Sequence, residues 1–289
     1  MSGGMESTNG PGAPPALVGK RIGFLGAGAM AEALIGGLVA AGVPAASLLA
    51  ADPDGARRQL VTQGFGIATT ESNAEAVSRS DVVVLAVKPA LVEPALRALA
   101  AVAAGDLARP LWISIVAGVP LARLTAALPG GARVVRAMPN TPALVRAGAT
   151  AFCGSAATSP ADRTAASQLF ETVGMCWESP TESLLDAVTG LSGSGPAYVF
   201  VFLEALGDAG VRVGLPRDAA ERLAVQTVLG AAKLAQQTGR HPAALKDQVA
   251  SPGGTTIAGL ERLEAGGLRD AVSDAVAAAT RRSKELAGG

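Results

Sequence analysis

The sequence predicts an N-terminal α/β domain with a mostly parallel sheet, followed by an all-α domain. Two observations predict this division. Short β-type runs alternate with helix-compatible segments in the first part of the chain, and from about Leu184 long alanine- and leucine-rich segments replace them. We therefore expect an α/β domain at 19–182 and a helical domain at 183–289, after a disordered tail at 1–18 that is rich in Gly, Pro and Ser.

The first expected strand, Arg21–Leu25, leads into a glycine-rich turn and then into a helix over Glu32–Ala41. The turn has the pattern G-x-G-x-x-A, in which the first glycine permits a tight bend and the second lets a phosphate approach the backbone. A dinucleotide pyrophosphate would lie on the N–H groups at the helix start. This succession of strand, glycine-rich turn and helix predicts a dinucleotide-binding, Rossmann-like domain. Its coenzyme contacts are expected at Gly26, Ala27, Gly28, Ala29 and Met30.

Further β-type runs continue the sheet. The run Val82–Val87 has no polar alternation, as expected of a strand that is buried on both faces. Strands are expected at Leu48–Ala51, Asp81–Val87, Leu111–Val116 and Val134–Ala137, with Ala149–Cys153 and Met175–Glu178 extending the sheet.

The helical domain is expected to contain helices at Ala197–Val211, Pro216–Thr238 and Leu268–Leu286. The first of them is apolar nearly all round, so it must be covered on most sides. A domain of this size can hardly surround it alone. We expect a second copy of the chain to complete the cover, with a central helix in a monomeric bundle as the alternative.

Composition excludes several classes of partner. Lys+Arg and Asp+Glu both number 24, and the chain has no long basic run, so nucleic acid and acidic membrane surfaces are not expected as partners. The uncharged run Leu34–Ala51 is broken by Gly and Pro, and we interpret it as a helix end, a turn and a strand, not a membrane span. No secretory signal is recognisable, so a cytoplasmic protein is expected. Cys153 and Cys176 are interpreted as buried small hydrophobes, and no metal site is expected.

The coenzyme type is left open by the residues after the second strand. Asp52 stands 24 residues after Gly28, where a carboxylate would accept hydrogen bonds from an adenine ribose 2′-OH and favour NADH. Arg57 and Arg58 follow, and a guanidinium there would instead bind the 2′-phosphate of NADPH. A third interpretation is that Asp52–Gly55 is a turn that caps the next helix.

Other candidate coenzyme contacts follow strand ends, at the edge where ligands bind in open α/β sheets. The segments Ala86-Val87-Lys88-Pro89 and Ala117-Gly118 should line the nicotinamide side with their backbones, and Lys88 is interpreted as a solvated lysine, not an acid. Met138 and Asn140 lie in Arg136–Pro142, a stiff segment that suits either a site floor or a plain turn.

Two glycine-rich segments each precede a helix in the helical domain, Thr189–Pro196 and Ser251–Thr256. In the second, Gly253 and Gly254 free the backbone. The N–H groups at the helix start, with the hydroxyls of Ser251, Thr255 and Thr256, can hold a small carboxylate. A loop with ordinary Ser/Thr caps is the alternative.

Hydrolytic machinery is not recognisable in the sequence. The single histidine, His241, precedes Pro242 in a turn, and no Ser/His/Asp, Cys/His or paired-carboxylate arrangement can be assembled around the expected crevice. Hydride transfer fits better, because the coenzyme does the chemistry while the protein positions the reactants.

Five segments together resemble the pyrroline-5-carboxylate reductase family, which catalyses the last step of proline biosynthesis. They are G-A-G-A-M-A at 26–31, A-V-K-P at 86–89, R-A-M-P-N-T-P at 136–142, T-G-L-S-G-S-G-P-A-Y at 189–198 and S-P-G-G-T-T at 251–256. The resemblance implies reduction of 1-pyrroline-5-carboxylate to L-proline with NADPH, NADH being possible. It also implies a homodimer with interlocked helical domains, and possibly a decamer.

The resemblance also implies roles for single residues. Ser251, Gly253, Gly254, Thr255 and Thr256 match the family's substrate-carboxylate loop, and Thr256 matches the hydroxyl nearest the ring nitrogen, the expected catalytic residue. Asn73 matches a contact to the coenzyme ribose, and Ala86, Lys88 and Pro89 match the backbone lining. Relatives often have Ser or Asn-Arg-Ser where this chain has Ala51-Asp52-Pro53, so the preference for NADPH stays open.

Two other interpretations are kept. A β-hydroxyacid dehydrogenase-like oxidoreductase would share the first domain and use a helical lysine such as Lys233 as its acid/base, but the loop at 251–256 would then lack a purpose. A nucleotide-sensing protein that has lost turnover is the third possibility.

Overall fold

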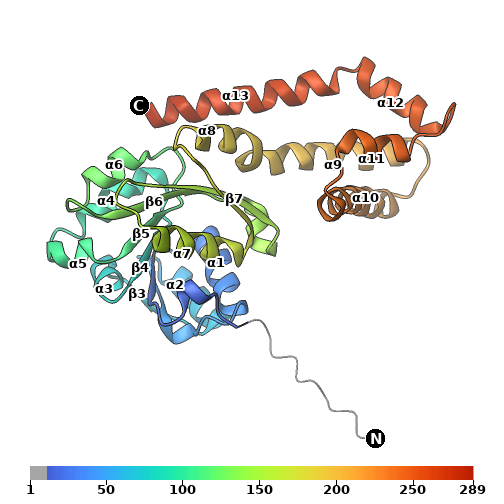
Figure 1. Cartoon of the computed structure of the whole chain (residues 1–289). Coiled ribbons are helices and arrows are strands. Elements are labelled where there is room, and N and C mark those ends of the chain that lie inside the picture. The colour runs from blue at the N-terminus through green and yellow to red at the C-terminus, as the bar shows by residue number, and fades with distance from the viewer. Residues whose placement is uncertain (1–11, 289) are drawn as a thin grey trace, which may run out of the picture. The chain divides into compact units, whose positions relative to one another are not determined.

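The computed structural model describes residues 12–288 and divides into two compact units (Figure 1). Among the described residues, the α/β unit comprises those up to Gly193 together with those from Ala279 on, and the helical unit comprises Ser194–Ala278. Within the described residues, no helix combines the length and the apolar character that crossing a membrane requires.

The α/β unit is built on an eight-stranded sheet in the order β3-β2-β1-β4-β5-β6-β7-β8. Neighbouring strands run parallel, except that β7 is antiparallel to β6. The predicted mostly parallel sheet is therefore confirmed. The strands are β1 Ile22–Leu25, β2 Leu48–Ala51, β3 Ala68–Thr70, β4 Val82–Leu85, β5 Leu111–Ser114, β6 Arg133–Met138, β7 Gly148–Gly154 and β8 Gly174–Glu178.

Helices cover both faces of this sheet. Because side chains alternate along a strand, Ile22 and Phe24 of β1 join the apolar cluster on one face, and Leu25 joins the cluster on the other. The first cluster includes residues of η1, α1, α2 and α7, and the second includes residues of α3, α4, α6 and α8 (Figure 1). The helices are η1 Pro15–Leu17, α1 Ala29–Ala40, η2 Ala45–Ser47, α2 Gly55–Phe65, α3 Asn73–Ser78, η3 Pro89–Leu91, α4 Val92–Arg97, α5 Ala104–Ala108, α6 Leu121–Ala126, η4 Thr141–Val145, α7 Pro160–Glu171, α8 Leu184–Val188 and the π-helical η5 Thr189–Gly193.

Part of the segment that was expected to be a disordered tail is structured. Residues 1–11 of the expected disordered tail lie outside the described residues, but Pro15–Leu17 form a turn of 3₁₀ helix. Leu17 is buried in the first apolar cluster, and the Ala16 N–H donates a hydrogen bond to Gln168 Oε1 of α7 at 2.8 Å. For these residues the prediction of disorder was wrong. Leu17 packs into the apolar cluster on one face of the sheet, and the Gly/Pro-rich composition of the segment does not indicate this contact.

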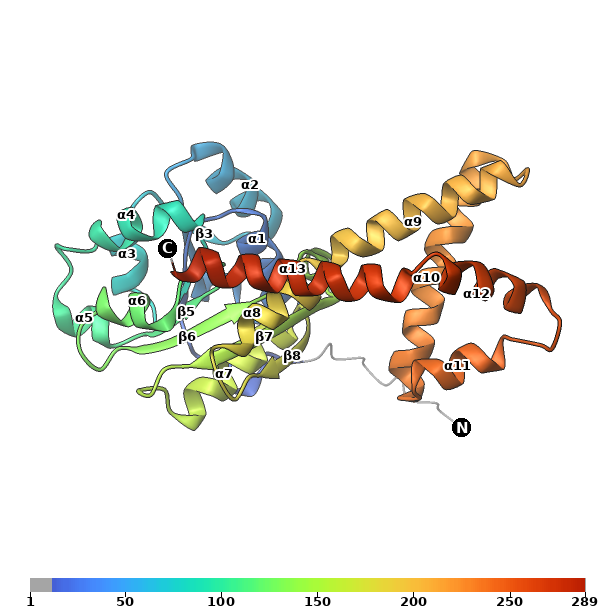
Figure 2. The ribbon, with the colours of Figure 1, turned by 90° about the horizontal axis from the view of Figure 1, so that it is seen from above.

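The helical unit contains α9 Gly195–Arg212, α10 Arg217–Thr238, α11 Pro242–Gln248, α12 Thr255–Ala265 and most of α13 Leu268–Gly288. The three predicted helices are thus present with small shifts of their ends. Figure 2 shows α10 crossing α9, and a Cβ on Gly210 would lie 3.0 Å from Ala220 Cβ, so the two helices approach closely there. The compact units part later than the predicted boundary at 182/183, because Leu185 of α8 is buried with the sheet.

Candidate coenzyme and substrate sites

Gly26 makes the bend that follows β1. Its φ is +99°, and a Cβ at this position would lie 2.7 Å from the Ala86 carbonyl oxygen. The Gly26 N–H donates to the Ala51 carbonyl oxygen at 2.7 Å, and the Ala86 N–H donates to that of Leu25 at 2.8 Å. The turn is therefore held between the ends of β2 and β4, in a space that admits only glycine.

The start of α1 suits an anionic ligand. Gly28 is its N-cap in an extended conformation, no side chain caps the helix, and a Cβ on Gly28 would meet nothing within 4 Å. Ala29 and Met30 form the first turn, so α1 begins at Ala29, before the predicted Glu32. The first N–H groups of the helix thus lie beside open space on a glycine that permits close approach. The residues fit a dinucleotide pyrophosphate.

Asp52 is part of this turn. Its Oδ2 accepts the Ala27 N–H at 2.8 Å, and its Oδ1 accepts the Asp54 N–H at 2.9 Å. Asp54 in turn caps α2 by accepting the Ala56 N–H. The capping interpretation is correct for Asp54, whereas Asp52 connects the end of β2 to the glycine-rich turn, a contact that sequence reasoning missed.

Both candidate arginines are engaged in holding the same region. Arg57 donates from Nε and Nη2 to the Ala27 carbonyl oxygen, at 2.9 and 2.6 Å, and pairs with Glu32 at 2.9 Å. Arg58 donates to the Asp52 carbonyl oxygen at 2.7 Å and pairs with Glu71 at 2.5 Å. The backbone of Ala27 is thus held at its N–H by Asp52 and at its carbonyl oxygen by Arg57.

The remaining predicted coenzyme contacts lie at the carboxyl ends of strands. Residues 86–89 follow β4 and residues 117–118 follow β5. Both strands are parallel to β1, so these segments and the glycine-rich turn all lie at the carboxyl ends of the strands, on the same side of the sheet. Lys88 is exposed, in keeping with its interpretation as a solvated lysine. Asn73 is the first residue of α3, directly after its cap Ser72, in the segment that follows β3. Contact of these residues with a coenzyme stays a prediction.

Asn140 has a structural role that the sequence did not reveal. It is buried at the end of β6, its Nδ2 donates to the Ser192 carbonyl oxygen at 3.0 Å, and its Oδ1 accepts the Ala149 N–H at 2.8 Å. The side chain thereby ties β6 to β7 and to the π-helical η5. Met138 contacts the same segment, since a Cβ on Gly193 would lie 2.6 Å from Met138 Cε.

The Ser251–Thr256 loop lies in the helical unit and ends at α12. Gly253 has φ +67°, which favours glycine, and a Cβ on Gly254 would lie 2.3 Å from Ser251 Oγ and 3.0 Å from the Ser251 carbonyl oxygen, so the loop approaches Gly254 closely. Thr255 and Thr256 are the first two residues of α12, whose N-cap Gly254 provides no side-chain cap. The N–H groups of the first turn and the neighbouring hydroxyls are of the kind that binds a carboxylate.

Other reactive side chains have ordinary roles. His241 Nδ1 accepts the Ala243 N–H at 3.2 Å and so caps α11. Cys153 and Cys176 are free, and burial raises the pKa of the Cys176 thiol to about 11, so it stays protonated at neutral pH. Lys233, the lysine of the dehydrogenase-like alternative, is exposed on α10.

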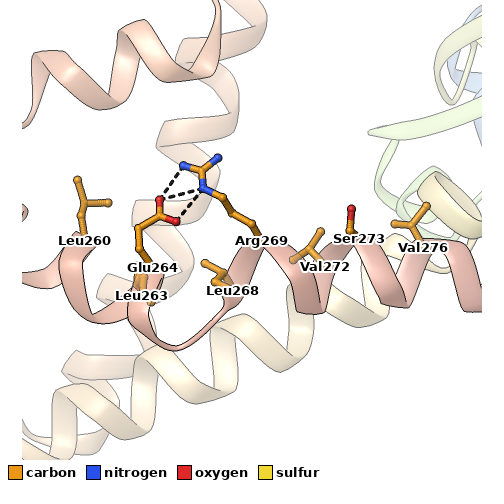
Figure 3. A pocket seen from close by; sticks show the side chains of 8 residues that line it. All are labelled: Leu260, Leu263, Glu264, Leu268, Arg269, Val272, Ser273 and Val276. Carbon is orange, nitrogen blue, oxygen red and sulfur yellow. Dashed lines mark hydrogen bonds and ion pairs between the residues drawn. The ribbon is translucent and has the colours of Figure 1, made fainter.

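The helical unit leaves much apolar surface exposed. Phe200 and Val201 of α9 are 63% and 66% exposed, and Leu223 of α10 is 57% exposed. A groove of about 560 Å³ runs along α12 and the start of α13, with the Glu264–Arg269 ion pair among its lining residues (Figure 3). Its apolar lining is Leu260, Leu263, Leu268, Val272 and Val276.

Two family models match the chain, and they correspond to its two parts. Residues 21–118 match the family described as NADP oxidoreductase, coenzyme F420-dependent, and residues 182–286 match pyrroline-5-carboxylate reductase dimerisation. The chain is 48% identical over 267 residues to the pyrroline-5-carboxylate reductase of Synechocystis, covering 92% of this chain and 98% of that protein. This chain belongs to the pyrroline-5-carboxylate reductase family. The family's enzyme from Escherichia coli is 40% identical over 268 residues, which cover 92% of this chain and 98% of that protein.

Solved structures of pyrroline-5-carboxylate reductases have the same fold. The enzyme from Coxiella burnetii superposes with a TM-score of 0.87 at 36% identity, covering 92% of this chain and 98% of that one. The Plasmodium falciparum enzyme, solved with NADP bound, has a TM-score of 0.82 at 31% identity over 93% of this chain and 98% of that one. The predicted fold and the resemblance to this family are confirmed.

Proposed function

We propose that the protein reduces 1-pyrroline-5-carboxylate to L-proline with a reduced nicotinamide coenzyme. The observation that carries the proposal is the start of α12 in a chain of this family: a helix N-terminus without a side-chain cap, flanked by three hydroxyl side chains and by Gly253 and Gly254. Such a site holds a small carboxylate, and the glycine-rich turn at β1 supports the coenzyme. NADPH is the coenzyme that the family resemblance implies, with NADH as the alternative.

The reaction requires few catalytic side chains from the protein. A protonated cyclic imine is already an electrophile, and the coenzyme supplies the hydride that its C5 carbon accepts. The loop at 251–256 would fix the carboxylate and so orient the ring, which lowers the entropic part of the barrier. The Thr256 hydroxyl would lie near the ring nitrogen and hold its proton.

A direct assay tests the proposal. Purified protein mixed with 1-pyrroline-5-carboxylate and either NADPH or NADH should consume the reduced coenzyme, followed by its absorbance, and should form proline in equal amount. Binding of both coenzymes without consumption of either would refute the reductase function and support a nucleotide sensor instead. Turnover of a β-hydroxyacid but not of the imine would support the dehydrogenase-like alternative.

We further propose that the exposed apolar surface of the helical unit is covered by a second copy of the chain. In residues 194–278, the buried apolar side chains are Ala220 and Ala224, far too few for an independent core. The match of 182–286 to a dimerisation family supports this arrangement. The homodimer is the proposed building block, and assembly into a decamer is a further possibility that the mass in solution decides.

Phe200→Asp should weaken this association. A carboxylate on the apolar side of α9 would have to be desolvated in the interface, so the dimer should dissociate at least about tenfold more readily. Sedimentation velocity over a dilution series measures the change. Leu60→Asp is the matched control, because Leu60 is 42% exposed on α2 of the other unit and should leave the mass unchanged. An unchanged mass for Phe200→Asp would place the interface elsewhere.

A further inference from the structure

We infer that Asp52 makes the coenzyme site selective for a free 2′-hydroxyl, so that the protein uses NADH in preference to NADPH. The inference rests on the proposed function in assuming that the glycine-rich turn holds a nicotinamide dinucleotide. It goes further by assigning the discrimination between the two coenzymes to one carboxylate and to the arginines around it.

The position of Asp52 provides the first argument. Asp52 follows the last residue of β2, and in this fold the carboxyl end of the second strand receives the adenine ribose. Its hydrogen bond to the Ala27 N–H fixes the carboxylate against the second residue of the coenzyme turn. A carboxylate has acceptor capacity beyond the two N–H groups that Asp52 binds here, so it can also accept from a ribose hydroxyl.

The commitment of the arginines provides the second argument. A site for the 2′-phosphate needs a guanidinium that can turn to it. Arg57 is held by the Ala27 carbonyl oxygen and by Glu32, and its side chain is 30% exposed. Arg58 is held by two backbone carbonyls and by Glu71, and its side chain is 19% exposed. Binding a phosphate with either guanidinium would disrupt contacts that hold the turn itself.

The local charge balance provides the third argument. The two candidate guanidinium groups are each already paired with a carboxylate, Arg57 with Glu32 and Arg58 with Glu71. Asp52 adds a carboxylate that is paired with neither arginine. A 2′-phosphate with a charge of about −2 placed beside this carboxylate would be repelled.

Calorimetric titration with two coenzyme fragments tests the inference without any turnover. The wild-type protein should bind ADP-ribose at least about tenfold more tightly than 2′-phospho-ADP-ribose. In the reductase assay, kcat/KM should favour NADH over NADPH by a similar factor. Equal or tighter binding of the phosphorylated fragment by the wild-type protein would overturn the inference, whatever the variants do.

Asp52→Asn should reduce the preference by about tenfold or more, because the amide removes the charge while its oxygen can still accept the Ala27 N–H. Asp54→Asn is the matched control. It removes the same charge two residues away and keeps a good N-cap for α2, so it should change the ratio by no more than about twofold. An equal change in both variants would assign the effect to general charge and not to Asp52.

The titrations separate this inference from the proposed function. If the protein prefers ADP-ribose but reduces no imine with either coenzyme, the function fails and the selectivity stands. If it makes proline faster with NADPH, the function stands and the selectivity fails.

Discussion

Replacing Thr256 by alanine is expected to lower kcat by roughly two orders of magnitude while coenzyme affinity changes by less than about threefold. The side chain belongs to the second residue of α12, where it is half-buried beside the start of the helix. In the proposed reaction its hydroxyl accepts a hydrogen bond from the N–H of the protonated ring nitrogen. This interaction contributes most to the rate while the nitrogen changes charge. The loss should therefore appear in turnover. Steady-state kinetics with saturating coenzyme, together with a coenzyme titration, measures both quantities.

Two variants control this experiment. Thr256→Ser retains the hydroxyl and should recover most of the turnover, whereas a packing defect would not be relieved by the smaller side chain. Thr255→Ala removes a neighbouring exposed hydroxyl of the carboxylate loop and should mainly raise KM for the imine. Equal losses of turnover and coenzyme affinity in Thr256→Ala would show that the loop does not face the substrate.

Replacing Gly26 by alanine is expected both to destabilise the fold and to abolish coenzyme binding. The new Cβ would lie 2.7 Å from the Ala86 carbonyl oxygen and 3.0 Å from its carbon, at a φ of +99° that alanine adopts only with strain. The clash is with backbone, so no side chain can move aside. We expect a loss of about 2–3 kcal/mol in the free energy of unfolding and a Tm lower by roughly 5–10 °C. Thermal denaturation and coenzyme titration check the two effects.

Gly28→Ala separates stability from binding. Gly28 has φ −69°, and a Cβ there would meet nothing within 4 Å, so the fold should keep its Tm within about 2 °C. The same Cβ would project into the space proposed for the pyrophosphate, so coenzyme affinity should fall by at least about tenfold. A Gly28→Ala protein that binds coenzyme normally would contradict the proposed position of the phosphates.

Patterns within short segments predicted most of the α/β fold. β4 was recognisable because the six consecutive aliphatic residues Val82–Val87 are typical of a strand that is buried on both faces, and the glycine-rich turn identified β1 and α1. β3, Ala68–Thr70, was missed because a three-residue strand at the sheet edge carries no apolar run. The antiparallel direction of β7 could not be read from composition, which says nothing of the direction in which a strand is paired.

For the candidate site too, the sequence predicted the local features and missed the contacts between distant residues. The glycines at 26, 28, 253 and 254 were predicted because their conformations are local. In the structure Gly26 and Gly253 have positive φ, Gly254 is closely approached by Ser251, and Gly28 is the N-cap of α1 beside open space. The clamp on Ala27 by Asp52 and Arg57 was not predicted, since it joins residues about 25–30 positions apart through side-chain directions that only the folded sheet fixes. The hydrogen bonds of Asn140 to Ser192 and Ala149 were missed for the same reason.

The scarcity of buried side chains in the helical unit affects how the protein is made. The buried residues of both apolar clusters of the α/β unit lie between Leu17 and Leu185, so this apolar core is synthesised before the helices that follow it. In the proposed dimer, the apolar faces of these helices would stay exposed to water until a second chain binds, so the last folding step would be bimolecular. Its rate depends on how many new chains are present. A poorly expressed protein would therefore accumulate half-folded subunits that expose Phe200 and Val201 to aggregation.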